Sequence, residues 1–153
     1  MNQATISQAP LPEATALAKQ CADYMFQNDT TSQALGMEII EVDEGYAVVT
    51  MSIRDHMLNG HKTCHGGMVF SLADSAFAFA CNSQNEAAVA ANCTIDFIRP
   101  ALANDKLTAT AQVQHQGKRT GIYQITIKNQ DDKLVALFKG NSARINQPVL
   151  VEE

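Results

Sequence analysis

The 153-residue sequence predicts an α+β fold in which a curved antiparallel sheet wraps around one long central helix. Two observations lead to this prediction. About six segments have the composition and alternation of β-strands, and the short connections between most of them favour antiparallel pairing. Only one long helical segment, residues 66–83, is apolar on nearly every side, so it needs cover almost all round. A single curved sheet around that helix satisfies both requirements.

The length and composition are those of one globular domain, expected to span residues 1–153. Apolar residues make up 46% of the chain and charged residues 18%, as in folded rather than disordered proteins. A domain of about 150 residues buries roughly 70% of the surface of its unfolded chain, which is enough for a full core. Residues 1–11 are polar and rich in small side chains, and we expect them to form a flexible arm.

The charge pattern excludes two classes of partner. A net charge of −5 leaves no basic surface for nucleic acid or anionic lipid. The first residues have neither the positively charged region nor the apolar region typical of a signal peptide, and no apolar stretch approaches the roughly 20 residues that span a bilayer. We therefore expect a cytoplasmic protein with no nucleic-acid or membrane partner. Its four cysteines have no disulfide or CxxC spacing, so we expect reduced thiols, mostly in the core: Cys21, Cys64, Cys81 and Cys93.

The N-terminal part of the chain predicts an amphipathic helix followed by a turn. Pro12 suits the start of a helix, which we expect to end near Asn28. The apolar residues recur at helical spacing on one face: Leu17, Cys21, Tyr24 and Met25. The polar stretch "NDTTSQ" that follows is typical of a turn.

Two β-rich runs, residues 34–42 and 46–53, surround the turn signal "DEG" and predict a hairpin. Residues 54–65 have no period and are expected to form a loop before the central helix. Four further strands follow that helix. In "KLTATAQVQHQ" and "IYQITIKN" apolar and polar residues alternate strictly, so one face of the sheet is expected to be covered and the other wet. "AANCTIDFIRP" and "KLVALFKGNSARI" complete the set.

The central helix carries one narrow polar stripe, formed by Ser71, Asp74 and Ser75. On base rates such a stripe faces solvent and its acid is a solvated charge. The helix also begins with "HGG", whose glycines allow close approach to its free N–H groups, and that end suits a carbonyl oxygen that gains negative charge. Asn59 in the preceding "LNGH" brings an amide towards the same place. Acid, amide and N–H donors together favour attack on an acyl carbon.

The same residues carry a family resemblance. "NGHKTCHGGMVFSLADSAFAFACNSQ", "CTIDFIRPA" and "HQGKRTGIY" together resemble the hotdog-fold acyl-CoA thioesterases, most closely the PaaI type of bacterial phenylacetate degradation. The resemblance spans residues 34–146, and the spacings from Asn59 to Gly66 and from Gly66 to Asp74 match that family. It implies a hotdog fold, a homodimer that shares its active site, and a homotetramer of two such dimers.

The resemblance also implies a role for each residue of the motif. The backbone N–H of Gly66 would polarise the thioester carbonyl, and Asp74 of the opposite subunit would act as general base or nucleophile. Asn59 would orient the water or the substrate, and His65 would support the oxyanion site. No metal or cofactor is implied, because the coenzyme A thioester is itself the activated substrate. The implied substrates are aryl or arylacetyl thioesters, with hydroxyphenylacetyl-CoA among them.

The phosphates of coenzyme A (CoA) need local positive charge in an acidic protein. The segment "FIRP" supplies Phe97 and Arg99, and both this segment and the glycine-bearing turn "QGKRTG" match CoA-contacting segments of the family. The residues expected from that turn are Gly117, Lys118, Arg119 and Thr120. Asn92 is a further candidate near the pantetheine channel. A turn with two cations is also simply well solvated, and for Lys118 alone this alternative is about as good.

Other functions were weighed on the same residues. His61, Cys64 and His65 resemble zinc ligands but lack a fourth partner at zinc-like spacing. A nucleophilic pair of Cys64 and His65 is disfavoured because adjacent residues seldom bring their side chains into contact. A non-catalytic hotdog module that binds acyl-CoA remains the main alternative, although simple binding requires no carboxylate beside the thioester. A hydratase would need a histidine with an acid in a different motif.

Overall fold

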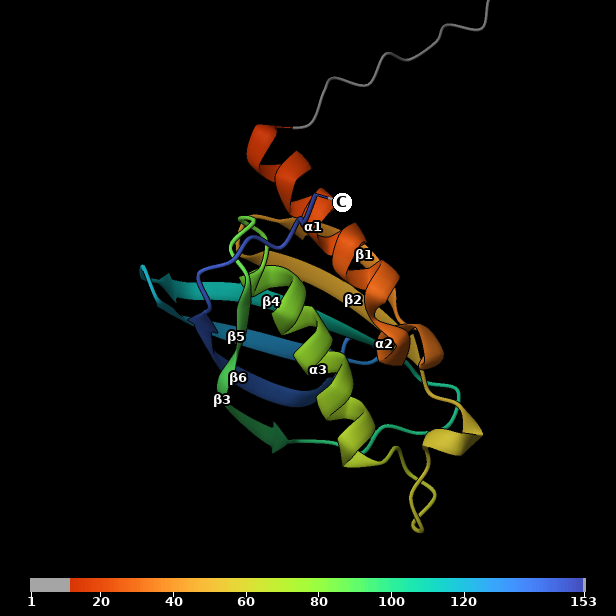
Figure 1. Ribbon diagram of the computed structural model, residues 1–153. Helices are drawn as coiled ribbons and strands as arrows, with labels where there is room; N and C mark the ends of the chain where they lie inside the picture. Colours follow the sequence, from red (N-terminus) through yellow and green to blue (C-terminus); the bar gives the residue numbers. More distant parts are fainter. Residues whose placement is uncertain (1–11, 153) are drawn as a thin grey trace, which may run out of the picture.

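The computed structural model describes residues 12–152, and over this range a six-stranded antiparallel sheet curves around the long helix α3 (Gly66–Cys81) (Figure 1). The strands lie in the order β1-β2-β4-β5-β6-β3, so β1 and β3 form the edges. Their bounds are β1 Glu38–Asp43, β2 Tyr46–Ser52, β3 Ala88–Phe97, β4 Lys106–Gln116, β5 Thr120–Lys128 and β6 Leu134–Arg144. The predicted α+β architecture is confirmed, whereas the arm expected at residues 1–11 lies outside the described residues.

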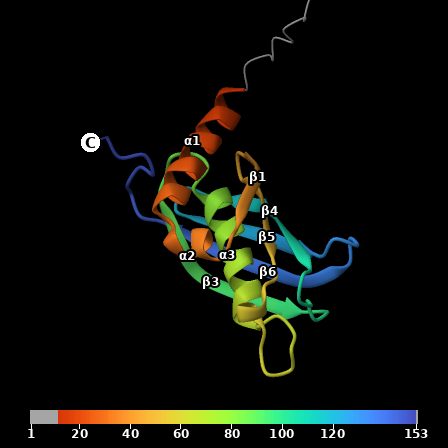
Figure 2. The same cartoon turned by 90° about the vertical axis from the view of Figure 1, so that its right-hand side faces the viewer.

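Helix α3 fills the concave side of the sheet, as Figure 2 shows from a second direction. Phe77 is 1% exposed and its ring centre lies 5.6 Å from that of Tyr123 on β5 and 6.1 Å from that of Phe138 on β6. Strand β6 approaches this ring closely at Gly140, where a Cβ atom would lie 2.7 Å from Phe77 Cζ. The helix is therefore held by aromatic packing against the centre of the sheet.

The strands alternate as predicted. Leu107, Ala109 and Ala111 of β4 are fully buried against the helix, while Thr108 and Thr110 between them point to the outer face. On β5 the buried side chains are Tyr123, Ile125 and Ile127. Because successive side chains of a strand point to opposite faces, this alternation gives one apolar and one polar face.

The N-terminal helix α1 (Glu13–Asn28) is confirmed, but the stretch predicted as a turn forms a short helix, α2 (Thr30–Ala34). The physical reason is an N-cap: the Asp29 carboxylate accepts the backbone N–H of Ser32 at 2.9 Å. A 3₁₀ turn, η1 (Asp55–Met57), lies within the predicted loop at 54–65. Among residues 12–152, no helix is long and apolar enough to cross a membrane.

The β1–β2 hairpin turns at Gly45, where the backbone φ is +67°. A Cβ atom at this position would lie 2.6 Å from Cγ1 of Val113 on β4. Both the left-handed backbone and the close approach require glycine. The predicted "DEG" turn signal is thereby explained.

Strand β3 is an edge strand with exposed apolar side chains. Val89 is 52% and Phe97 is 56% exposed, and the strand is irregular between Ala90 and Asn92. An uncovered edge of this kind offers a free row of backbone donors and acceptors for another strand. All four cysteines are free thiols and three of them are buried, as expected from their spacing.

Candidate active site

Asp74 lies in the third turn of α3 and its side chain is half-buried. It takes part in no hydrogen bond or ion pair with any residue in the range 12–152. Its carboxylate instead lines a cavity of about 360 Å³ between α1, α3 and the start of β3, and side chains from α1 and α3 face it there: Tyr24, Met25, Phe77 and Cys81. An unpaired, partly dehydrated carboxylate at the wall of an apolar cavity is costly unless it has a chemical task.

The surroundings of Asp74 favour its protonated form. Burial raises the pKa of this carboxyl above its ordinary value, and the negative charge of Asp29 raises the pKa further. Asp29 is held in place from the start of α2: its Oδ2 accepts the hydroxyl of Ser32 at 2.5 Å, and that hydroxyl lies 2.8 Å from Ser75 Oγ on α3. The polar stripe of the helix is therefore partly satisfied by α2 rather than by water alone.

In the described part of the chain, one N–H donor in the first turn of α3 has no acceptor. His65 is the N-cap: its Nδ1 accepts the N–H of Gly67 at 2.9 Å, and its carbonyl oxygen accepts the N–H of Met68 at 2.9 Å. The N–H of Gly66 has no acceptor among the described residues. The terminus can thus offer the Gly66 N–H and the positive end of the helix to an anion.

Asn59 is used by its own loop. Its Oδ1 accepts the N–H of His61 at 2.9 Å, its Nδ2 donates to Thr63 Oγ1 at 3.1 Å, and its backbone N–H donates to the carbonyl oxygen of Thr63 at 2.8 Å. The loop is joined to α3 where the N–H of His65 donates to the carbonyl oxygen of Met57 at 2.8 Å. In this arrangement Asn59 shapes the loop before the helix.

Phe97 and Arg99 lie beside the same end of α3. A Cβ atom on Gly66 would lie 3.0 Å from Phe97 Cζ, so the ring packs directly against this glycine. Gly66, Phe97 and Arg99 line a shared cavity of about 290 Å³. The Arg99 guanidinium donates to the carbonyl oxygen of Leu134 at 3.3 Å and is otherwise exposed, so it can meet a ligand anion.

The turn between β4 and β5, residues 117–120, presents exposed side chains of Lys118, Arg119 and Thr120. Asn92 is exposed on β3 next to Cys93, which packs towards the core, so Asn92 points from the opposite face of the strand. The structure therefore does not place Asn92 beside Asp74.

Two distances divide the predicted site residues of one chain into separate groups. Gly66 and Asp74 are eight residues apart on one helix, which is about 12 Å along its axis. Phe97 pairs with Ala136 and Thr120 pairs with Ala143, which places these two candidates about 23 Å apart along β6. A single chain thus brings together Gly66, His65, Phe97 and Arg99, but it leaves Asp74 and the 117–120 turn elsewhere.

A thiol nucleophile receives no support from the geometry. Burial raises the pKa of Cys64 to about 11, so its thiol stays protonated at neutral pH. Its Sγ lies 3.6 Å from the carbonyl oxygen of His65 rather than near the imidazole. Within residues 12–152, no three side chains of the metal-binding types are grouped so as to hold an ion.

Sequence reasoning missed three contributors. Asp29 acts on Asp74 by its charge, Gln116 holds the backbone of the 117–120 turn, and Arg144 ties that turn to the segment after α3. Asp29 was a usable signal, because aspartate is a favoured N-cap residue. Gln116 and Arg144 gave none, because their roles depend on contacts between strands.

Comparison with known proteins agrees with this picture. The profile of the thioesterase superfamily matches residues 61–136. The chain is 61% identical over 135 residues to the acyl-coenzyme A thioesterase PaaI of Escherichia coli strain K12, covering 88% of this chain and 96% of that protein. The solved structure of E. coli PaaI, from the phenylacetic acid degradation operon, has a TM-score of 0.87 at 60% identity, covering 88% of this chain and 98% of that one.

A solved structure of a hypothetical thioesterase of Streptococcus pneumoniae TIGR4 with coenzyme A has a TM-score of 0.74 at 25% identity. The match covers 82% of this chain and 96% of that one. Together these similarities confirm the predicted hotdog fold.

Proposed function

The chain belongs to the PaaI-type acyl-CoA thioesterases of the thioesterase superfamily, and we propose that it hydrolyses aryl or arylacetyl thioesters of CoA to the free acid and CoA. Hydroxyphenylacetyl-CoA is included among the proposed substrates. The observation that carries the proposal is that two groups on α3 have no partner among residues 12–152: the half-buried carboxylate of Asp74 and the N–H of Gly66 at the helix start. The operon named for the E. coli relative supports the aromatic acyl group.

In the proposed mechanism the thioester carbonyl oxygen accepts the N–H of Gly66 and lies at the positive end of α3. Asp74 either removes a proton from the attacking water or attacks the carbonyl carbon itself, and both routes remain open. The C–S bond then breaks, and on the general-base route the CoA thiolate takes up the proton that Asp74 removed from water. On the nucleophilic route the acyl group stays on Asp74 as an anhydride, and water then hydrolyses this anhydride to the free acid and supplies the proton for the thiolate. Thioesters are already activated, so one carboxylate and aligned donors suffice. The hydrogen bonds of Asn59 within its loop and the N-cap of His65 keep the start of α3 in place.

Gly66 and Asp74 of one chain are about 12 Å apart along α3, so a single thioester carbonyl group cannot contact both of them. This distance supports a site shared by two chains. Antiparallel pairing of two β3 edges would place the Phe97 end of one strand opposite the Ala88 end of the other. It would also bring the 117–120 turn of one copy towards Gly66 and Arg99 of its partner. Acyl-CoA is thus the proposed substrate of a homodimer. The homotetramer and the cytoplasmic location stay predictions.

The substrate proposal is tested by the release of free thiol from a panel of acyl-CoAs that includes phenylacetyl, hydroxyphenylacetyl and straight-chain groups. We expect the aromatic thioesters to have the highest kcat/KM. If the protein binds these thioesters with no turnover, it is the non-catalytic binding module instead. Higher kcat/KM for straight-chain groups would contradict the proposed acyl preference.

The oxyanion role of Gly66 is tested by Gly66→Pro, with Gly66→Ala as the matched control. Proline is tolerated at the first helical position, and the ψ of 132° at His65 suits a residue before proline. Both variants crowd Phe97, but only proline removes the N–H. We expect kcat to fall on the order of a hundredfold to a thousandfold for proline and far less for alanine. Equal losses in the two variants would show that crowding, not the donor, matters.

The shared site is tested by mixing two inactive variants, Gly66→Pro and Asp74→Asn, after separate purification and subunit exchange. In a mixed dimer one site carries both defects and the other carries neither. An equal mixture should therefore regain about a quarter of wild-type activity. Lack of any recovery, with exchange verified by mass spectrometry, would place Gly66 and Asp74 of one chain in the same site.

A further inference from the structure

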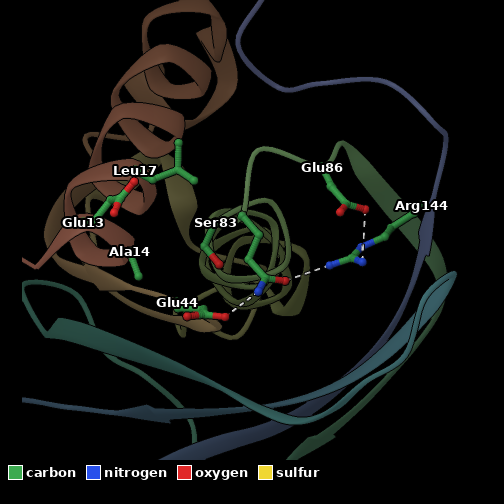
Figure 3. Close-up of a pocket in the computed structure, with 8 residues that line it drawn as sticks. Glu13, Ala14, Leu17, Glu44, Ser83, Glu86 and Arg144 are labelled. Atoms are coloured by element: carbon green, nitrogen blue, oxygen red, sulfur yellow. Dashed lines mark hydrogen bonds and ion pairs between the residues drawn. The ribbon is translucent and has the colours of Figure 1, made fainter.

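Arg144, at the end of β6, connects three segments that are far apart in the sequence. Its side chain is only 12% exposed, and its Nη1 lies 3.0 Å from Glu86 Oε2. Its Nη2 donates to Gln84 Oε1 at 2.8 Å, and Gln84 in turn donates to Glu44 of the β1–β2 turn. These side chains line a cavity of about 640 Å³, and Figure 3 shows Glu86 and Arg144 facing each other at its wall.

The same arginine also donates hydrogen bonds to carbonyl oxygens of the 117–120 turn. Its backbone N–H donates to the carbonyl oxygen of Arg119 at 2.8 Å, and its Nη1 reaches the carbonyl oxygen of Lys118 at 3.4 Å. Gln116 Nε2 donates to the carbonyl oxygen of Gly117 at 2.9 Å, and the N–H of Gly117 closes the turn onto its last carbonyl oxygen at 2.9 Å. All four carbonyl oxygens of the turn are therefore occupied by donors of the protein.

This arrangement decides which groups the turn presents to a ligand. With the carbonyl oxygens engaged by the protein, the exposed surface of the turn is made by the cations of Lys118 and Arg119 and the hydroxyl of Thr120. A free carbonyl oxygen among them would repel a phosphate, whereas N–H groups and cations attract it. The planar guanidinium of an arginine spreads five N–H donors over three nitrogens in a fixed fork, so it can reach acceptors on separate segments. The three donors of a lysine lie on one nitrogen.

We propose that Arg144 is a positioning residue that keeps the 117–120 turn in the shape that binds the phosphates of CoA. This inference rests on the proposed function, since it assumes that the turn meets the nucleotide end of the thioester. It assigns no contact between Arg144 and the substrate. Replacement of the side chain keeps the backbone bond to Arg119 and frees the carbonyl oxygen of Lys118. Binding of the phosphorylated part of CoA should therefore weaken, and the acyl chemistry should stay unchanged.

The test uses Arg144→Lys in the full-length protein and two thioesters of the same acid, one of CoA and one of pantetheine, which has no nucleotide phosphates. For the CoA thioester we expect KM to rise at least about fivefold with kcat changed less than about twofold. For the pantetheine thioester both constants should stay at their wild-type values. An equal change with both substrates would indicate a general structural role and overturn the inference, as would an unchanged KM for the CoA thioester.

A second variant and a binding measurement cover other outcomes. Glu86→Gln removes the charge that faces Arg144 at a side chain that is 58% exposed, so the fold should tolerate it, and KM should rise for the CoA thioester alone. The matched control is Lys128→Met, which removes a cation paired with Asp132 at the other end of β5. It should leave KM and kcat unchanged for both thioesters.

Calorimetric titration with CoA itself requires no turnover, so it separates the two proposals. A wild-type protein that binds CoA but hydrolyses no thioester would contradict the proposed function. An unchanged Kd for CoA in Arg144→Lys would contradict only the inference about the turn. A Kd that rises at least about fivefold in the variant supports it.

Discussion

Replacement of Asp74 by asparagine separates the catalytic role of the carboxylate from its effect on stability. Asparagine is nearly isosteric with aspartate and removes only the charge. Since Asp74 has no hydrogen bond or ion pair within residues 12–152, the change breaks no contact there. Loss of a general base typically costs on the order of a hundredfold to ten thousandfold in rate, so we expect kcat to fall within that range.

The same substitution should stabilise the fold. Burial raises the pKa of Asp74 in the folded state above the ordinary value of 3.8, so the folded protein binds this proton more tightly than the unfolded chain does. The favourable contribution of the protonated carboxyl is complete below the unfolded pKa and is lost as the pH rises through the folded pKa. Above the folded pKa the wild type therefore carries a partly buried charge that the asparagine variant lacks.

Two measurements check this pair of effects. Thiol release from an aromatic acyl-CoA gives kcat, and urea denaturation at pH 7 and at pH 3 gives the free energy of unfolding for both proteins. We expect the variant to be more stable at pH 7 and equal to the wild type at pH 3, with its activity lost. Full kcat in the variant would refute the catalytic role, and lower stability at pH 7 would refute the inference that Asp74 is unpaired.

Three further predictions concern the surroundings of the site. Asp29→Asn keeps an N-cap but removes the charge that raises the pKa of Asp74, so the acid limb of the pH–kcat profile should move to lower pH; an unmoved limb would exclude this coupling. His65→Ala should lower the free energy of unfolding by about 1 kcal/mol, whereas His65→Asn should largely restore it, as measured in urea; equal losses would mean that capping is not the role. Gly45→Ala should cost about 2 to 4 kcal/mol on the same measurement, because the φ of +67° and the valine methyl at 2.6 Å both oppose a Cβ; a loss below about 0.5 kcal/mol would contradict the close approach.

The strands and the central helix could be predicted because their signals are local. A period of two residues in β4 and the all-round apolar character of α3 are visible within a dozen residues, and the bounds of β4 match the alternating stretch that predicted it. The short helix α2 was missed because a single N-cap contact, from Asp29 to Ser32, outweighs the turn-like composition of that stretch.

The site was predictable only where it lies on one element. Gly66 and Asp74 are readable because the helix sets their spacing, and the structure keeps both on α3. Arg144 gave no signal in the sequence because its partner Glu86 lies 58 residues away and meets it only when β6 and the segment after α3 come together. Partners chosen by strand pairing cannot be inferred from periodicity.

The spacing on α3 also explains how one helix can serve both halves of the proposed reaction. The effect of a helix terminus falls off within its first turn, so Asp74, about 12 Å from the start of its own helix, receives little of that positive potential. During the attack of water, negative charge leaves the carboxylate and gathers on the thioester oxygen. In the proposed dimer that oxygen contacts the helix start of the other chain. The positive end then lies where the charge arrives rather than where it began, which stabilises the transition state more than the ground state.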